Sequence, residues 1–182
     1  MILDWEIDSS WTLFLDRDGV INHRVMGGYV QSIPEFKFLE GTTDAISIFS
    51  SVFSNIFIIT NQQGIGKGLM SECNLLEIHS YMCEEIEKKG GKITKCYYAP
   101  ELKSEPNSSR KPGPKLGLKA KEEFPSIDFN KSIMIGDTDS DIQFGKNLGM
   151  KTVRIKTIEP INIEADFTCN NLKEFSKAFY YE

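Results

Sequence analysis

Acidic, hydroxyl and basic side chains follow successive apolar runs of the sequence, where they could act together on a phosphate ester. The first run leads into two aspartates separated by one residue, and a later run leads into a third aspartate. A threonine follows another apolar run, and an Arg-Lys pair lies in a proline-rich stretch. The candidate residues are Asp16, Asp18, Thr60, Arg110, Lys111 and Asp137.

The three aspartates imply a bound cation. Carboxylates that converge repel one another unless a cation lies among them, and oxygen ligands without His or Cys select a hard ion such as Mg²⁺. A lysine and a threonine hydroxyl beside that ion would bind the non-bridging oxygens of a phosphoryl group, and an aspartate could attack phosphorus in line. Two aspartates on one tight turn can take different roles if one binds metal and stays ionised while the other keeps a raised pKa.

Each motif also has a purely structural interpretation when it is taken alone. An Asp-x-Asp after a strand is compatible with a turn and a helix cap. It does not fit a calcium loop, because Val20 and Ile21 stand where a third ligand and a glycine are needed. The glycine-rich run 64–68 does not fit a P-loop, because Asn61 and Gly68 replace its first glycine and its Ser/Thr. The functional prediction therefore depends on the combination of motifs.

Apolar runs alternate with helical patterns along nearly the whole chain, which is typical of a parallel sheet with helices on both faces. Strands are predicted at 11–15, 56–59, 93–98, 132–135 and 152–155. Helices are predicted around 45–52, between Ser71 and Gly90, over 115–124, around 142–148 and from Asn171 onward. Parallel sheets bind ligands beyond the carboxyl ends of their strands, so this three-layer, Rossmann-like α/β fold brings the candidate residues to one edge.

Length and charge limit the other possibilities. The chain has 182 residues, and its net charge of −5 comes from 21 Lys and Arg against 26 Asp and Glu. We expect a single domain over residues 1–182, a monomer, and no broad basic face for nucleic acid. No apolar stretch approaches the ~18–20 residues of a membrane helix and no signal-peptide pattern opens the chain, so we expect no membrane partner and a cytoplasmic location. The loops 21–40 and 99–114 are long enough to be functional.

The set of motifs resembles that of the phosphatases of the haloacid dehalogenase superfamily. The resemblance is carried by Asp16 to Asn22, Thr60-Asn61-Gln62, Lys111 and Gly136-Asp137. Within the superfamily, Gly28-Tyr29-Val30, Gln63 to Gly66 and Arg110-Lys111-Pro112 resemble the branch of the heptose bisphosphate phosphatases and histidinol-phosphatases. Members of this branch are essentially capless, which agrees with the short chain.

The resemblance implies a role for each candidate residue. Asp16 would be the nucleophile, and Asp18 would protonate the leaving oxygen and later deprotonate water. Mg²⁺ would be held by Asp16, the backbone carbonyl of Asp18, and Asp137. The phosphoryl oxygens would be bound by Thr60 and Lys111, and the rest of the substrate by Asn61, Gln62, Gln63 and Arg110. For Asp141, both metal ligation and orientation of this edge remain open.

The resemblance also implies a substrate class. The expected reaction is Mg²⁺-dependent hydrolysis of a small phosphorylated metabolite, with D-glycero-D-manno-heptose 1,7-bisphosphate as the first expectation and histidinol phosphate as the alternative. A polynucleotide 3′-phosphatase and a non-catalytic phosphate-binding module are less favoured. Members of the branch commonly carry a zinc site before their Arg-Lys-Pro motif, whereas the loop 99–110 contains no Cys or His, so zinc is not expected.

Overall fold

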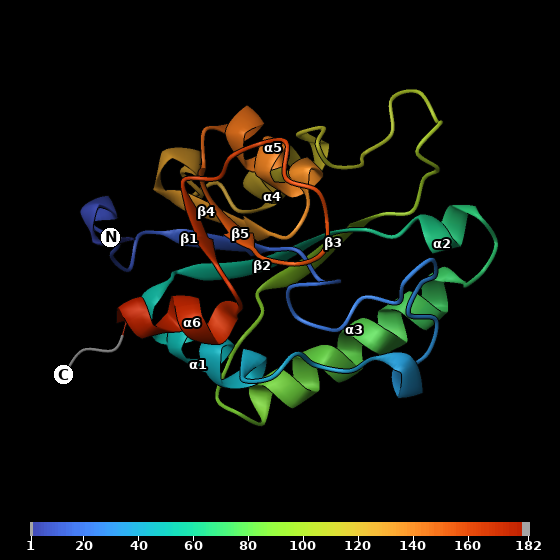
Figure 1. The fold of residues 1–182 in the computed structure, drawn as a ribbon, viewed down its shortest axis with the longest axis horizontal. Helices are drawn as coiled ribbons and strands as arrows, with labels where there is room; N and C mark the ends of the chain where they lie inside the picture. Colours follow the sequence, from blue (N-terminus) through green and yellow to red (C-terminus); the bar gives the residue numbers. More distant parts are fainter. Residues whose placement is uncertain (1, 180–182) are drawn as a thin grey trace.

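A six-stranded, all-parallel sheet lies at the centre of the computed structural model, which describes residues 2–179 (Figure 1). The strands are β1 Thr12–Leu15, β2 Asn55–Asn61, β3 Lys95–Ala99, β4 Ser132–Gly136, β5 Lys151–Ile155 and β6 Phe167–Cys169. Their order across the sheet is β3-β2-β1-β4-β5-β6. The five predicted strands are confirmed, and the short edge strand β6 was not predicted. The expected domain of residues 1–182 includes residues 1 and 180–182, which lie outside the described residues.

Helices cover both faces of this sheet, as the alternating pattern predicts (Figure 1). The α-helices are α1 Thr42–Val52, α2 Gln63–Gly66, α3 Glu72–Glu87, α4 Lys115–Glu123, α5 Asp139–Leu148 and α6 Leu172–Ser176. The short 3₁₀ helices are Ile2–Trp5, Ile33–Glu35, Phe129–Lys131 and Lys177–Phe179. Helices α1, α3 and α6 lie on one face and α4 and α5 on the other (Figure 1). Within residues 2–179, every helix is too short or too polar to cross a membrane.

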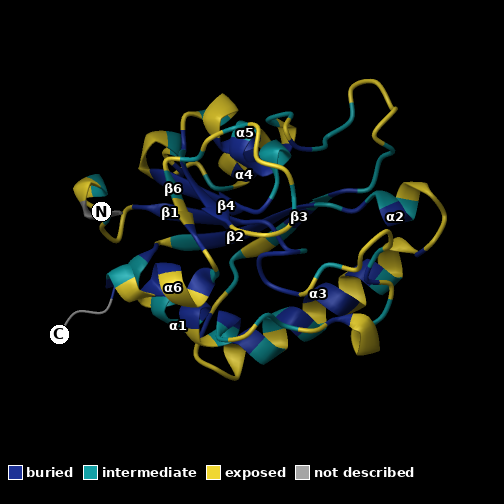
Figure 2. Cartoon of the chain, viewed as in Figure 1, coloured by how far each residue is buried: buried dark blue, intermediate teal, exposed yellow. Residues whose placement is uncertain are grey.

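The central strand β1 is buried on both of its faces. Leu13 and Leu15 point into the core beneath α1 and α3, whereas Phe14 points into the core beneath α4 and α5. Both faces of a parallel strand are covered, so its residues are apolar without alternation. Figure 2 shows the central strands β1 and β4 as buried and the outer faces of the helices as exposed.

Local capping interactions fix where the helices begin. Ser71 accepts a hydrogen bond from the backbone N–H of Asn74 at 3.1 Å, which closes the capping box at the start of α3. Asn171 accepts from the N–H of Glu174 at 2.8 Å at the start of α6. Both N-caps agree with the sequence prediction, because each satisfies a backbone donor left free by the first helical turn.

The loop 100–114 leaves the sheet beyond β3 and extends past the ends of the strands near α2 (Figure 1). The backbone N–H of Gly66 in α2 donates to the Pro100 carbonyl at 3.0 Å. Within the loop, the Glu101 carboxylate accepts from the backbone N–H of Ser109 at 3.0 Å and from its hydroxyl at 2.8 Å. The Glu101 carboxylate therefore closes the loop from within.

Candidate active site

The candidate residues meet at the carboxyl edge of the sheet, where the strand order reverses direction between β1 and β4. Asp16 directly follows β1, and its backbone N–H donates to the Ile135 carbonyl of β4 at 2.9 Å. Thr60 lies near the end of β2, and Asp137 directly follows β4. This is the position at which open parallel sheets form their ligand crevices.

Lys111 is the buried cation of the site. Its side chain is only 1% exposed, and its Nζ lies 2.8 Å from Asp16 Oδ1 and 2.5 Å from Asp141 Oδ1. The same Nζ donates to the Ile59 carbonyl at 2.6 Å. Three oxygen acceptors satisfy the ammonium group, which burial alone would discharge. Although burial works against the charge, the two carboxylates raise the pKa of Lys111 above its ordinary value.

Asn61 positions this lysine from the end of β2. Its Oδ1 accepts from the backbone N–H of Lys111 at 2.9 Å, and its Nδ2 donates to the Lys111 carbonyl at 3.2 Å. Both the oxygen and the nitrogen of the Asn61 amide are therefore hydrogen-bonded to the Lys111 backbone. The sequence predicts Asn61 as a substrate contact, whereas these bonds make it a residue that also orients the lysine.

Three carboxylates surround the place expected to hold the metal. Asp16, Asp137 and Asp141 each offer an oxygen within 4.8 Å of the others. Burial and the Asp16 and Asp141 charges raise the pKa of Asp137 to about 8. Burial, together with Asp141, raises the pKa of Asp16 to about 6 even though Lys111 opposes the shift. Buried like charges of this kind are stabilised by a hard cation, so the donor set fits Mg²⁺.

Two glycines let these groups approach one another. Gly19 has a φ of +94°, and a Cβ there would lie 2.4 Å from Asp137 Oδ2. A Cβ on Gly136 would lie 2.0 Å from the Cβ of Asp141. Any side chain at either position would therefore push a carboxylate out of the cluster.

Asp18 has the opposite electrostatic surroundings. Its carboxylate accepts from Arg17 Nη2 at 3.0 Å on both oxygens, from Asn22 Nδ2 at 2.9 Å and from Gln62 Nε2 at 2.9 Å. Burial works against ionisation, but the Arg17 charge and these hydrogen bonds lower the pKa of Asp18. Without a bound ion, the fold therefore gives the hydrogen-bond donors to Asp18 and the charge crowding to Asp16. The expectation that the metal-binding aspartate stays ionised while the other keeps a raised pKa concerns the metal-bound site and stays a prediction.

Arg17 lies behind Asp18 and was not predicted as a site residue. Its side chain is fully buried, and its Nη1 lies 3.4 Å from Nε2 of His79 on α3. Burial first, and the Arg17 charge second, lower the pKa of His79 to about 3. The imidazole is therefore neutral and accepts from Arg17. His79 is itself buried on α3, so its role is to support Arg17 within the protein.

The other predicted substrate residues divide into two groups. Thr60 and Arg110 line a cavity of about 460 Å³ that also reaches Asp16, Asp18 and Lys111. Gln62 is 1% exposed and donates to the Thr60 hydroxyl at 2.9 Å. Gln63 donates to the Tyr29 hydroxyl at 3.2 Å and accepts from the Lys103 N–H at 2.6 Å. The side chains of the two glutamines therefore make hydrogen bonds to other groups of the protein.

Two further residues complete the site. Asp141 holds Lys111 with Oδ1, and its Oδ2 accepts from the Thr138 hydroxyl at 2.6 Å, so the orienting role considered for it is present. Arg24, from the loop 21–40, places its Nη2 2.9 Å from Asp137 Oδ1. No sequence signal marked Arg24, because it belongs to none of the motifs. Its contact depends on how the loop folds over the sheet edge.

Comparisons with known proteins agree on a family of hydrolases. The family described as HAD-hydrolase-like matches residues 108–174. The D-glycero-alpha-D-manno-heptose-1,7-bisphosphate 7-phosphatase of Campylobacter jejuni is 40% identical over 169 residues, covering 92% of this chain and 94% of that protein. The D-glycero-beta-D-manno-heptose-1,7-bisphosphate 7-phosphatase of Pasteurella multocida is 34% identical and covers 89% of this chain and 90% of its own.

A solved structure shares the fold. It is the D,D-heptose 1,7-bisphosphate phosphatase of B. bronchiseptica complexed with magnesium and phosphate, and it aligns with a TM-score of 0.82. The alignment covers 92% of this chain and 97% of that one at 23% sequence identity. The likeness confirms the α/β architecture predicted from the alternating pattern.

Proposed function

The chain belongs to the haloacid dehalogenase-like hydrolases and is a phosphatase, and from this premise we propose that it removes the 7-phosphate of D-glycero-D-manno-heptose 1,7-bisphosphate. The observation that carries the proposal is the buried Lys111–Asp16 pair, 2.8 Å long, at the wall of a cavity of about 460 Å³. That volume lies within the range of small-molecule sites. The relatives that match nearly the full chain are named for this substrate.

Asp16 and Asp18 divide the proposed reaction between them. A carboxylate oxygen of Asp16 attacks phosphorus, the bond from phosphorus to the leaving oxygen breaks, and Asp18 gives that oxygen a proton. Water then attacks the aspartyl-phosphate and passes its proton to Asp18, which releases inorganic phosphate and restores Asp16. In this second step Asp18 must be ionised, and the donors from Arg17, Asn22 and Gln62 support that state.

The remaining residues bind the phosphoryl group. Phosphatases of this family use Mg²⁺, and the ion supplies positive charge to the phosphoryl oxygens. We assign it to Asp16, the Asp18 carbonyl and Asp137. The Thr60 hydroxyl and the Lys111 ammonium would bind the non-bridging oxygens as charge shifts onto them.

Two cationic side chains could bind a second anionic group of the substrate. Arg110 and Lys67 line the same cavity as the catalytic carboxylates. Arg110 is held by its own hydrogen bond to the Glu101 carbonyl at 3.2 Å, so the loop 100–114 positions it. We propose that these cations receive the phosphate that is not cleaved.

We also propose that the chain acts as one domain and as a monomer in the cytoplasm, without a nucleic-acid or membrane partner. A monomer is supported because every proposed site residue comes from the same chain. The net charge of −5 further disfavours a partner that needs a broad basic face.

The substrate assignment is tested by a panel compared by kcat/KM in the presence of Mg²⁺. The panel contains both anomers of heptose 1,7-bisphosphate, histidinol phosphate and a 3′-phosphorylated oligonucleotide. We expect a heptose bisphosphate to be preferred by at least about a hundredfold. A higher kcat/KM for either of the other two substrates would overturn the assignment.

The nucleophile is tested by Asp16→Asn. The variant should lose turnover of every substrate in the panel, because an amide cannot form the acyl-phosphate. Circular dichroism should show an unchanged fold. Phosphatase activity retained by the folded variant would rule out Asp16 as the nucleophile.

A further inference from the structure

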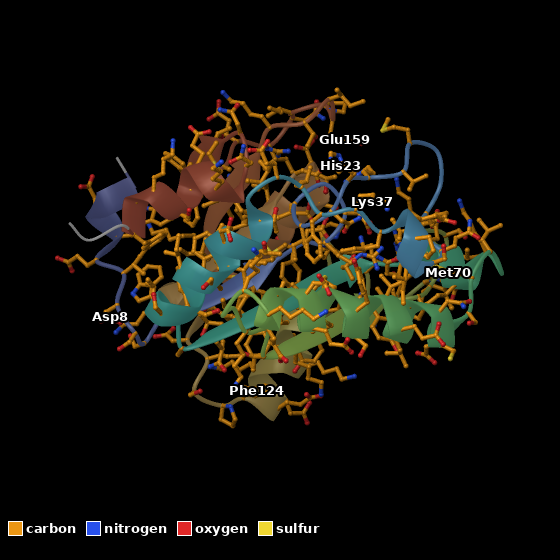
Figure 3. All side chains as sticks on the ribbon, turned by 90° about the horizontal axis from the view of Figure 1, so that it is seen from below. Asp8, His23, Lys37, Met70, Phe124 and Glu159 are labelled. Carbon is orange, nitrogen blue, oxygen red and sulfur yellow. The ribbon has the colours of Figure 1, made fainter. Side chains whose placement is uncertain are left out.

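Arg24 contacts the same oxygen atoms that are assigned to the metal. Its Nη2 donates to Asp137 Oδ1 at 2.9 Å and to the Asp18 carbonyl at 3.3 Å. Its Nη1 donates to Glu159 Oε1 at 2.6 Å. Figure 3 shows Glu159 on the same side of the molecule as His23, the neighbour of Arg24 in the chain. The guanidinium is therefore anchored on one side by the carboxylate cluster and on the other by Glu159.

Two cations cannot use these oxygens fully at the same time. Mg²⁺ requires its oxygen ligands at about 2.0–2.1 Å in an octahedral arrangement. A guanidinium that donates to the same lone pairs occupies ligand directions and repels the ion. We propose that Arg24 is a displaceable counter-ion, which balances the carboxylate cluster and competes with Mg²⁺ for Asp137 and the Asp18 carbonyl.

Exposure distinguishes Arg24 from the other cation of the cluster. The Lys111 side chain is 1% exposed and has three oxygen acceptors, whereas the Arg24 side chain is 28% exposed. Arg24 comes from a loop whose next residues, Val25 and Met26, are also exposed. Glu159, 30% exposed, gives its guanidinium an anchor outside the cluster. Arg24 can therefore leave Asp137 without becoming an unpaired buried charge, and Lys111 cannot.

The opposite role for Arg24 would be to hold Asp137 in place for the metal. The two roles predict opposite changes when the charge is removed. A competitor that is lost strengthens Mg²⁺ binding, whereas a supporting residue that is lost weakens it. The inference rests on the metal ligands assigned under the proposed function, so the test must separate failure of the inference from failure of that assignment.

The first measurement is Mg²⁺ affinity by isothermal titration calorimetry. We expect Arg24→Gln to bind Mg²⁺ about tenfold more tightly than the wild type, within the usual range of coupling between two sites. Lys37→Gln is the matched control, because it removes the same charge from an exposed side chain of the same loop. It should leave the affinity within about twofold. Equal or weaker Mg²⁺ binding by Arg24→Gln would overturn the proposal.

The second measurement is thermal unfolding, which does not depend on catalysis. With EDTA, Arg24→Gln should melt about 3 °C below the wild type, because Asp137 loses its counter-ion. At saturating Mg²⁺ the difference should disappear, since the ion then balances the cluster in both proteins. A difference that persists unchanged at saturating Mg²⁺ would mean that Arg24 is only a structural contact.

Asp137→Asn separates failure of the inference from failure of the proposed function. If Asp137→Asn loses Mg²⁺ binding while Arg24→Gln leaves it unchanged, the metal site stands and the competition is refuted. If the wild type itself binds no Mg²⁺, both the metal assignment and the inference fail.

Discussion

Asp16 and Asp18 lie two residues apart on one turn, yet their surroundings push their pKa values in opposite directions. Asp16 faces two other carboxylates, Asp137 and Asp141, and its pKa is raised to about 6 by burial and charge crowding. Asp18 faces Arg17 and the amide of Gln62, and its pKa is lowered. The difference shows that chain position does not decide the protonation state of a buried carboxylate. The elements packed against each side chain decide it.

The site therefore contains two regions that differ in charge, one around Asp16 and one around Asp18. The Asp16 region has an excess of negative charge, so it depends on Lys111 and on a bound ion. The Asp18 region already has one cation and two amide donors directed at a single carboxylate. In the proposed reaction, these donors would favour the ionised Asp18 that accepts a proton from water, and they would oppose its protonated state.

The largest effect should follow from removing the cation of the Asp16 region. Lys111→Met leaves Asp16 and Asp141 buried without their counter-ion, so we expect the free energy of unfolding in EDTA to fall by ~3 kcal/mol. Turnover should fall about a thousandfold, because a charge that stabilises the phosphoryl oxygens is lost. Urea unfolding and steady-state kinetics measure the two effects.

Lys67→Met provides the control for this experiment. Lys67 lines the same cavity but is exposed, so its loss should change the free energy of unfolding by less than ~0.5 kcal/mol. If Lys111→Met proved as stable as Lys67→Met in EDTA, the Asp16 region would not depend on a buried cation.

A smaller effect should follow from removing a donor of the Asp18 region. Gln62→Met deletes the hydrogen bond to Asp18 Oδ2, so the ionised carboxylate is less stabilised and its pKa rises. The pH profile of kcat/KM should then move to higher pH by about one unit, and kcat at the optimum should fall about tenfold. Rates measured across the pH range test this shift.

Gln63→Met is the matched control, because Gln63 contacts Tyr29 and the Lys103 backbone and has no contact with Asp18. Its profile should keep the wild-type position on the pH axis. A shift of the same size in both variants would show that the hydrogen bond to Asp18 is not its cause.

An effect confined to acidic pH concerns His79, which supports the Asp18 region through Arg17. The pKa of His79 is lowered to about 3, whereas an unfolded histidine titrates near ~6.5. Below pH ~6.5 the unfolded chain binds one more proton than the folded chain. The contribution of His79 to the free energy of unfolding is therefore fully present above pH ~6.5 and is lost as the pH falls. The loss should approach ~1.4 kcal/mol per pH unit between about pH 6 and about pH 4.5.

His79→Gln keeps an acceptor for Arg17 but does not titrate. Its free energy of unfolding should therefore depend less on pH than that of the wild type over this range. Urea unfolding at several pH values measures the difference. Parallel pH dependences of the two proteins would show that His79 is protonated in the folded state.

Periodicity predicts most of the fold because the long elements carry enough residues to show it. The strands β1 to β5 and the helix α3 lie close to their predicted ranges. The elements β6 and α2 are three and four residues long, so each is too short for a hydrophobic period to repeat. Their positions depend on neighbours, as when Gly66 in α2 meets the Pro100 carbonyl.

The sequence by itself determined which residues gather at the sheet edge, because motifs that follow parallel strands must meet at their carboxyl ends. It also determined the hard-ion chemistry, since the motifs that follow these strands offer oxygen ligands and no His or Cys. Only the tertiary structure decided which aspartate is crowded by charge, and that Arg24 reaches Asp137 from a loop without a motif. Those outcomes depend on distances of a few ångströms between segments far apart in the chain, and electrostatic energies at buried sites change steeply over such distances.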